Sequence, residues 1–263
     1  MKYKKRLRRV GIACAAAVLL GISCNVSLKS VYYDIDTEED GAPVKIAFLS
    51  DVHNSFYGKG QAELVQKIKE FDTDIVLFGG DLFDEHNGEE NSWALVDALV
   101  GEYPCFYAIG NHEFNTGKPK FYKSEMEKRG VTVLDDETTV ITVNDRRIRI
   151  CGIENVRDEN AAAELDDTYS VLLYHYPLDF PEMSEKGFDL ILSGHAHGGQ
   201  WRIPGLINGV FAPDEGFFPQ YAGGFYSRNG TDMIVSRGLY RNISCLFIPR
   251  IFNRPELVFI TLK

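Results

Sequence analysis

Four short groups of residues in this chain carry carboxylate, imidazole and amide side chains at spacings that suit metal ligands. The groups are Asp51-Val52-His53, Gly80-Asp81-Leu82-Phe83-Asp84, Gly110-Asn111-His112-Glu113 and Gly194-His195-Ala196-His197. A fifth candidate, His175, lies between the last two groups. Singly, most are weak signals, because Asp-x-His arises often by chance and a histidine at a strand end is commonly structural. Gly-His-x-His is stronger, since two imidazoles two residues apart can face one cavity. All five in this order would rarely arise by accident.

Short apolar segments come directly before these groups and have the length of buried strands. They cover residues 44–49, 74–78, 105–109, 169–174 and 189–192. In α/β folds, ligands bind at the carboxyl ends of strands, where loops carry chemistry on a rigid base. We therefore expect five strand ends to bring metal-type ligands together.

The remaining segments complete an α/β pattern. Apolar residues at helical spacing predict helices over 61–71, 93–100 and 120–129. Two alternating segments, 138–143 and 146–150, flank Asn144-Asp145, which is a favourable two-residue hairpin turn. Late strands are predicted over 231–236 and 257–262. Without a Pro- or Ser-rich linker, the chain is predicted to form one domain, residues 31–263, after a targeting segment, residues 1–30.

The order of these groups resembles the calcineurin-like metallophosphoesterase family. Its motifs run Asp-x-His, Gly-Asp-x-x-Asp, Gly-Asn-His-Asp/Glu, His and Gly-His-x-His, and all are matched between about residues 44 and 200. The longer stretch from Ser193 to Gln200 resembles a bacterial, membrane-anchored branch that includes enzymes similar to UDP-2,3-diacylglucosamine pyrophosphatases. The resemblance implies a four-layer α/β fold, with two mixed sheets face to face and helices outside.

The resemblance also implies a role for each matching residue. One metal would be held by Asp51, His53 and His197, and the other by Asn111, His175 and His195. Asp81 would bridge the two metals, since a shared carboxylate offsets the repulsion between neighbouring cations. His112 would act at the leaving oxygen, and Asp84 would orient His112. The role of Glu113 would be structural.

The implied chemistry is hydrolysis of a phosphodiester, phosphomonoester or pyrophosphate bond by a hydroxide that bridges two divalent metals. Because the ligands are nitrogen and oxygen without thiolate, they suit Mn²⁺, Fe or Zn²⁺, of which we favour Mn²⁺. Two alternatives stay open: a nucleotide phosphodiesterase, because the metal core does not choose the substrate, and a non-catalytic metal-binding scaffold. The complete ligand set and the presence of His112 favour an enzyme.

Candidate substrate contacts follow the last histidine. The segment 201–226 concentrates aromatic residues among Gly and Pro, either to fill a minor core or to form an apolar wall for an acyl chain or a base. Trp201 belongs to this wall, and Arg202 and Arg237 could bind a phosphate that is not transferred, or could be solvated surface charges. The substrate would then be a phosphate ester that is lipid-linked or belongs to the cell envelope.

The N-terminus has the composition of a membrane signal. Six basic residues lie within residues 1–9 and precede an uncharged apolar run over 10–28, which is near the lower length limit for a transmembrane helix. The basic flank predicts a catalytic domain outside the cytoplasm, attached to the membrane. A cleaved signal peptide, with export of the domain, is the alternative.

Charge and cysteine content narrow the class of partner. Of 28 Lys and Arg residues, 22 lie beyond the N-terminal cluster. With 38 Asp and Glu residues, this gives the rest of the chain a formal net charge of about −16. Such an acidic domain lacks the footprint of a general nucleic-acid binder. Cys105, Cys151 and Cys245 are not spaced as a metal knuckle or a redox pair. The oligomeric state does not follow from these features.

Overall fold

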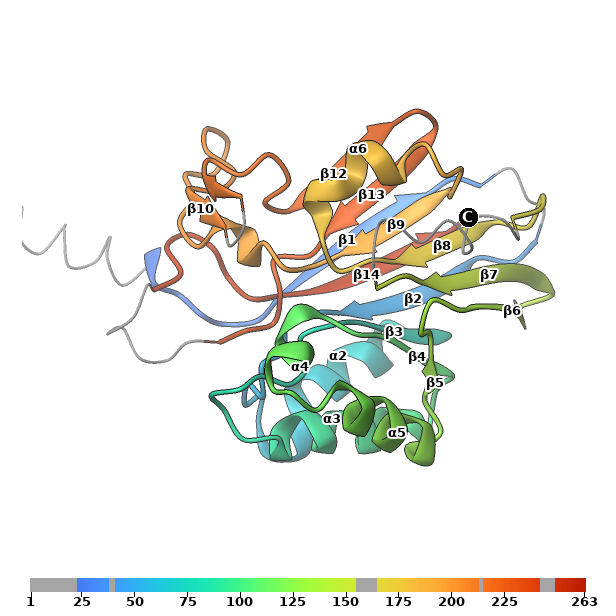
Figure 1. The fold of residues 1–263 in the computed structure, drawn as a ribbon, viewed down its shortest axis with the longest axis horizontal. Helices are drawn as coiled ribbons and strands as arrows, with labels where there is room; N and C mark the ends of the chain where they lie inside the picture. The colour runs from blue at the N-terminus through green and yellow to red at the C-terminus, as the bar shows by residue number, and fades with distance from the viewer. Residues whose placement is uncertain (1–22, 38–40, 155–164, 213–214, 242–248) are drawn as a thin grey trace, which may run out of the picture.

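Two six-stranded sheets lie face to face and form the centre of the molecule (Figure 1). The structure is a computed structural model that describes residues 23–37, 41–154, 165–212, 215–241 and 249–263. In the described part of the chain, no helix has the length and apolarity needed to cross a bilayer. Most of the apolar run predicted over 10–28, and Cys245, lie outside the described residues.

The first sheet has the order β1-β14-β2-β3-β4-β5, in which β2 to β5 run parallel and β14 is antiparallel to β2. Its strands are β1 (Lys29–Ile35), β2 (Val44–Leu49), β3 (Ile75–Gly79), β4 (Cys105–Ala108), β5 (Thr132–Val133) and β14 (Glu256–Leu262). The edge strand β1 pairs in parallel with β14, 227 residues further along the chain. It begins at Lys29, on the predicted domain boundary, and was not predicted as a strand.

The second sheet has the order β12-β13-β9-β8-β7-β6 and is also mixed. Strands β7, β8, β9 and β13 are parallel, and antiparallel strands close both edges. Its strands are β6 (Thr138–Val143), β7 (Arg146–Gly152), β8 (Ser170–Leu173), β9 (Leu190–Ser193), β12 (Gly224–Arg228) and β13 (Thr231–Val235). A separate two-stranded sheet joins β10 (Phe211–Ala212) to β11 (Gly216–Phe217).

Alternation along β2 shows how the layers are built. Ile46 and Phe48 point into the core between the sheets, whereas Ala47 and Leu49 point to the helix layer, as the two-residue period of a strand requires. Both faces of the strand are therefore buried, which explains why its sequence is an unbroken apolar run.

Helices cover the outer face of each sheet, as Figure 1 shows. The first sheet carries η1 (Lys59–Gln61), α2 (Ala62–Glu70), α3 (Glu90–Val100), α4 (Asn111–Asn115) and α5 (Pro119–Arg129). The second sheet carries η2 (Pro177–Asp179), α6 (Phe180–Met183) and η3 (His197–Gly199), together with the loops around β10. The prediction of two mixed sheets flanked by helices is confirmed.

Candidate metal centre

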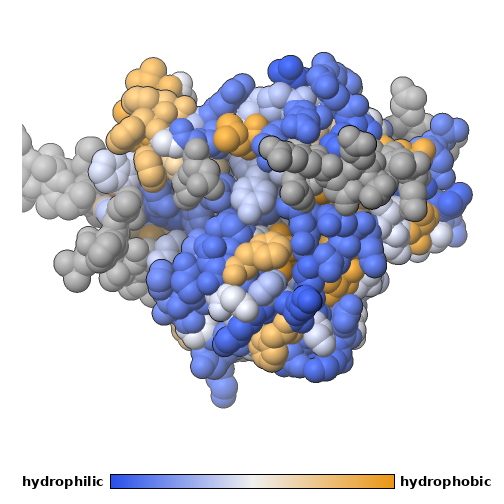
Figure 2. All heavy atoms as spheres, viewed as in Figure 1, coloured by the Kyte–Doolittle hydropathy of each residue, from blue (hydrophilic) through white to orange (hydrophobic). Residues whose placement is uncertain are grey.

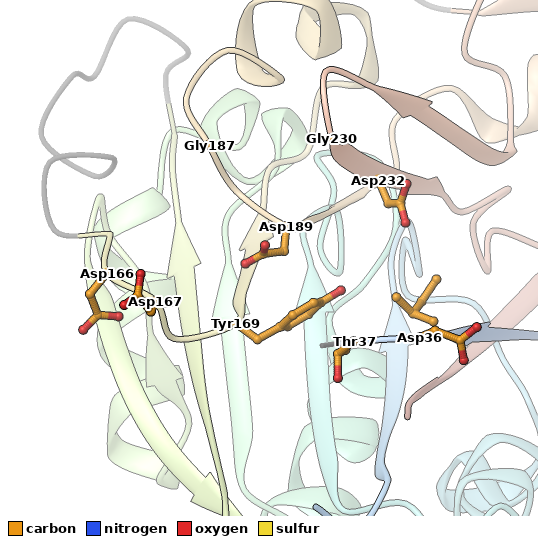
Figure 3. Close-up of a pocket in the computed structure, with 10 residues that line it drawn as sticks. Asp36, Thr37, Asp166, Asp167, Tyr169, Gly187, Asp189, Gly230 and Asp232 are labelled. Carbon is orange, nitrogen blue, oxygen red and sulfur yellow. The ribbon is translucent and has the colours of Figure 1, made fainter. Parts of the chain in front are cut away.

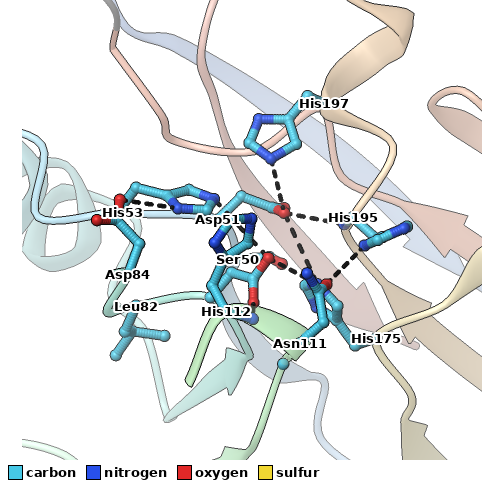
Figure 4. Close-up of polar contacts among 12 residues, drawn as sticks. Ser50, Asp51, His53, Leu82, Asp84, Asn111, His112, His175, His195 and His197 are labelled. Carbon is cyan, nitrogen blue, oxygen red and sulfur yellow. Dashed lines mark hydrogen bonds and ion pairs between the residues drawn. The ribbon is translucent and has the colours of Figure 1, made fainter. Parts of the chain in front are cut away.

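Seven side chains from five strand ends meet in one centre, and Figure 4 labels all of them except Asp81. Ligand atoms of Asp51, His53, Asp81 and His197 all lie within 4.8 Å of one another, and those of Asp81, His175 and His195 form a second such group. Asn111 joins the second group, because its Oδ1 lies 2.8 Å from His195 Nδ1. The structure thus brings together every residue predicted as a metal ligand, and Asp81 belongs to both groups.

Five of these residues have a strained backbone conformation that directs their side chains into the centre. Asp51, His53, Asp81, His195 and His197 all have φ between 45° and 65°, the left-handed region that residues with a Cβ seldom adopt. Such strain concentrates at functional sites, where the surrounding fold holds it in place. Parallel strands hold these turns here: Asp51 N donates to Gly80 O and His53 N donates to Asp81 O, both at 3.0 Å.

Hydrogen bonds at one ring nitrogen orient the histidines. His175 Nδ1 donates to the carbonyl of Gly79 at 2.8 Å, and His53 Nδ1 lies 3.2 Å from Asp84 Oδ2. Because these partners are acceptors, Nδ1 carries the proton and Nε2 is left for the centre. His53 Nε2 and Asp51 Oδ2 are buried and make no hydrogen bond among the described residues, whereas His175 Nε2 and Asp81 Oδ2 lie 3.0 Å apart as an ion pair inside the centre.

The electrostatic field of the centre favours cations. Asp51 and Asp81 are almost fully buried. Burial lowers the pKa of His175, but Asp81, Asp51 and the carbonyl of Gly79 together raise that pKa to about 10. His197 differs, since burial, His53 and Arg250 hold its pKa well below the usual value and keep its imidazole neutral, as metal ligation requires. Two buried carboxylates among four imidazole side chains are suited to bind divalent metal ions.

The residues around His112 differ from the expectation. Asp84 does not contact His112: its Oδ2 bonds to His53, and its Oδ1 accepts hydrogen bonds from the backbone N–H groups of His86 and Asn87. This local turn fixes the Asp84 carboxylate below His53. Instead, Glu85 Oε2 lies 2.8 Å from His112 Nδ1. Asp84 therefore orients a predicted metal ligand, and Glu85 takes the place that we predicted for Asp84.

Comparison with known proteins gives the same assignment as the geometry. Residues 44–199 match the model of the calcineurin-like phosphoesterase family. The chain belongs to this family. It is 30% identical over 229 residues to the uncharacterized protein YpbG of Bacillus subtilis, which covers 82% of this chain and 84% of YpbG. It is 28% identical to the phosphodiesterase YaeI of Escherichia coli, covering 86% of this chain and 84% of YaeI.

A solved structure shows the same fold. The NAD nucleotidase NadN of Haemophilus influenzae aligns with a TM-score of 0.52 at 16% identity, over 76% of this chain and 51% of that one. Family membership makes the chain a metallophosphoesterase, a hydrolase that acts on phosphoric ester bonds.

Glu113 links two of the ligand loops of the phosphoesterase. Its buried carboxylate accepts four backbone hydrogen bonds: Oε1 from Leu82 and Phe83, and Oε2 from Asp81 and Gly110, at 2.7–3.1 Å. Burial and then Asp81 raise the pKa of this carboxyl to about 7. The loop after β3 and the loop after β4 are therefore joined through one side chain.

Two residues near the C-terminus support the centre and were not predicted. Arg250 is buried, donates to the carbonyl of Arg237 at 2.7 Å and places Nη2 3.4 Å from His197 Nδ1. Asn253 Nδ2 donates to the carbonyl of His197 at 2.7 Å. No local motif marks them, because more than fifty residues separate them from His197.

The predicted substrate residues lie beside the centre rather than in it. Trp201 is 42% exposed, and its Nε1 donates to the carbonyl of Pro249. Arg237 is only 8% exposed and donates to Asn208 Oδ1 and to the carbonyl of Gly223, so it is not a solvated surface charge. Arg202 is partly buried beside Arg237 in a shared cavity.

A cavity of about 450 Å³ lies at the opposite end of the second sheet (Figure 3). It is lined by Asp36, Asp166, Asp167, Asp189 and Asp232. Asp189 directly precedes β9, whereas the candidate ligand His195 follows it. Asp189 accepts hydrogen bonds from Ser170, and Asp166 pairs with Arg149. Because Asp166 and Asp189 are engaged by protein partners, we assign no metal to this cavity.

Close packing at Gly194 gives a direct test of the centre. A methyl group on Gly194 would overlap Ser50 Oγ and lie 2.5 Å from Asp51 Oδ2. Gly194→Ala should therefore displace Asp51 and lower metal affinity about 10- to 100-fold, measured by titration of the metal-free enzyme. Gly101→Ala is the matched control, because a Cβ there meets nothing within 4 Å. Equal metal affinity in both variants would contradict the placement of Asp51 as a ligand.

Proposed function

We propose that this phosphoesterase hydrolyses a phosphodiester or pyrophosphate bond in a lipid-linked substrate of the cell envelope, using two divalent cations. The observation that carries the two-metal proposal is the pair of buried ligand groups that share Asp81. Asp51, His53, Asp81 and His197 would hold one cation. Asp81, Asn111, His175 and His195 would hold the other, and the nitrogen and oxygen donors favour Mn²⁺.

Bound cations would polarise the phosphoryl group and activate water for attack. The residues of the chain supply orientation and proton transfer. His112 is well placed to transfer a proton, since its ring packs edge-on against His53 with the centroids 4.7 Å apart and its side chain is 28% exposed. With Nδ1 held by Glu85, Nε2 remains to donate a proton to the leaving oxygen.

Three features support the proposed location and substrate class. The N-terminal basic and apolar segment predicts attachment to a membrane with the catalytic domain outside the cytoplasm. The aromatic segment after His197 gives an apolar surface next to the centre. The similarity to YaeI, which is named a phosphodiesterase, supports cleavage of a diester.

The test uses the full chain in detergent, stripped of metal and refilled with Mn²⁺. Turnover of bis-(p-nitrophenyl) phosphate should depend on metal and exceed that of p-nitrophenyl phosphate. UDP-diacylglucosamine and a cyclic nucleotide would then be compared as substrates. Preference for the cyclic nucleotide would overturn the lipid-linked class. Two bound metals without turnover of any ester would indicate a scaffold.

Proton donation by His112 predicts a specific pattern of defects. His112→Ala should lower kcat about 10²- to 10⁴-fold while metal content stays unchanged. Glu85→Gln should lower kcat about 10- to 100-fold, because the imidazole loses its orienting carboxylate. The control is Glu90→Gln, an exposed carboxylate at the start of α3. If Glu85→Gln matched this control in kcat, the role of Glu85 would be wrong.

A further inference from the structure

An exposed apolar surface lies next to the metal centre. We call it the apolar lobe, and it consists of the described residues in the range 201–218 around β10 and β11. Figure 2 shows it as an orange patch at the upper left, above the label position of β10 in Figure 1. Leu206, Phe217 and Phe218 are 78%, 75% and 67% exposed, and Trp201, Ile203 and Phe211 are also exposed. Clustered exposed side chains of this size mark an interaction site.

The lobe is an ordered structure that holds these side chains outward. Val210 N donates to the carbonyls of Gly199 and Trp201, and Phe218 N donates to the carbonyl of Val210. An apolar cavity of about 280 Å³ opens between Trp201 and Phe217. Such a cavity could take the end of an acyl chain. These backbone hydrogen bonds hold the lobe in a shape that leaves its apolar side chains exposed.

The lobe lies where the described chain begins. Trp201 bridges to Ile251, and Phe252 N donates to the carbonyl of Ser23 at 2.6 Å. Ser23, in the described end of the apolar run over 10–28, thus lies on the same side of the molecule as the lobe. A membrane bound by that run would then lie on the side of the lobe.

A basic cavity adjoins the lobe. It has a volume of about 250 Å³ and is lined by Lys29, Arg202, Arg237 and Arg254, with Glu256 as its acidic residue. Arg202 Nε and Arg237 Nη1 are buried and make no hydrogen bond among the described residues. Burial and then Arg237 lower the pKa of Arg202, so the positive charges there repel each other. Four basic side chains face one acidic side chain here, Glu256, whose Oε2 lies 3.6 Å from Arg237 Nε, and this excess of positive charge suits an anion.

We propose that the apolar lobe and the basic cavity form one surface that rests on an anionic phospholipid bilayer. The exposed Trp and Phe side chains would enter the interfacial region, and the cavity would bind the headgroup phosphate. This inference rests on the proposed membrane location but not on catalysis. His197 begins η3, which leads through Gln200 to Trp201, so this surface would bring the metal centre close to lipid headgroups.

Tryptophan fluorescence can test this contact in the full chain, which has two tryptophans. Trp93→Phe leaves Trp201 as the reporter, and Trp201→Phe leaves Trp93, which lies in α3 on the outer side of the other sheet (Figure 1). Each variant would be reconstituted into phosphatidylcholine vesicles with and without phosphatidylglycerol, with bromine atoms on the acyl chains. We expect bromine to quench and blue-shift Trp201 but not Trp93, more strongly with phosphatidylglycerol.

Further variants separate the two parts of the surface. In the Trp93→Phe background, Leu206→Ser with Phe218→Ser should abolish quenching. Phe121→Ser, which changes an exposed aromatic residue of α5 away from the lobe, should not. Arg202→Gln should remove the effect of phosphatidylglycerol. The inactive Asp81→Asn variant should be quenched normally, which separates this inference from the proposed catalysis.

Three outcomes would overturn the inference. Vesicle-bound chain without quenching of Trp201 would mean that the N-terminal segment alone holds the membrane or covers the lobe. Chain that does not bind vesicles would refute the membrane location as well. Binding of inorganic phosphate that depends on Arg202, without quenching of Trp201, would assign the cavity to a soluble phosphate ester.

Discussion

Asp81→Asn is expected to lower phosphodiester turnover by at least about 10²- to 10³-fold and to reduce bound metal from two equivalents to one or fewer. Asp81 is 1% exposed and is the residue that the two ligand groups share. An amide of the same shape keeps one oxygen but removes the negative charge that offsets repulsion between neighbouring cations. Metal content would be measured by elemental analysis, and turnover with bis-(p-nitrophenyl) phosphate.

The backbone around Asp81 makes this a test of charge rather than of folding. Asp81 Oδ1 accepts a hydrogen bond from His112 N at 2.9 Å, and an amide oxygen can still accept it. The metal-free variant should therefore still unfold cooperatively, although it loses the ion pair between Asp81 Oδ2 and His175 Nε2. Asp232→Asn, in the acidic cavity of Figure 3, is the matched control and should keep both metals and activity. Two metals retained in Asp81→Asn would refute the bridging role.

The metal ligands could be predicted from sequence because each depends on local features. A parallel strand that is buried on both faces, such as β2 or β3, appears as an apolar run, and the polar residue that ends the run must lie at the edge of the sheet. Parallel neighbours end at the same edge. Within each sheet, this was enough to predict which side chains meet, whereas the meeting of the side chains after β8 and β9 with those after β2, β3 and β4 was implied by the family resemblance.

Features that depend on distant contacts or on a single turn could not be predicted. Whether Asp84 or Glu85 reaches His112 depends on the turn at His86 and Asn87. The backbone N–H groups of these two residues bind the Asp84 carboxylate, and the Glu85 carboxylate contacts His112 instead. Strand β1 has a weak apolar pattern because it lies at a sheet edge and only one of its seven residues is buried. Arg250 becomes part of the centre only after β14 has paired with β2.

The remaining large effect concerns Glu113, where replacement by Gln should lower both stability and metal affinity. Each carboxylate oxygen accepts two backbone hydrogen bonds, so an amide would leave two buried N–H groups facing its NH₂. Leaving two buried donors unpaired costs about 2–5 kcal/mol, or roughly 5–15 °C in Tm. Metal affinity should fall as well, because the N–H groups belong to Asp81 and to Gly110, the neighbour of Asn111.

Glu127→Gln, an exposed carboxylate on α5, is the control. If calorimetry showed equal Tm values, Glu113 would not hold the two loops. A lower Tm with unchanged metal affinity would limit its role to folding, whereas loss of both would show that one buried carboxylate stabilises the fold and positions the ligands.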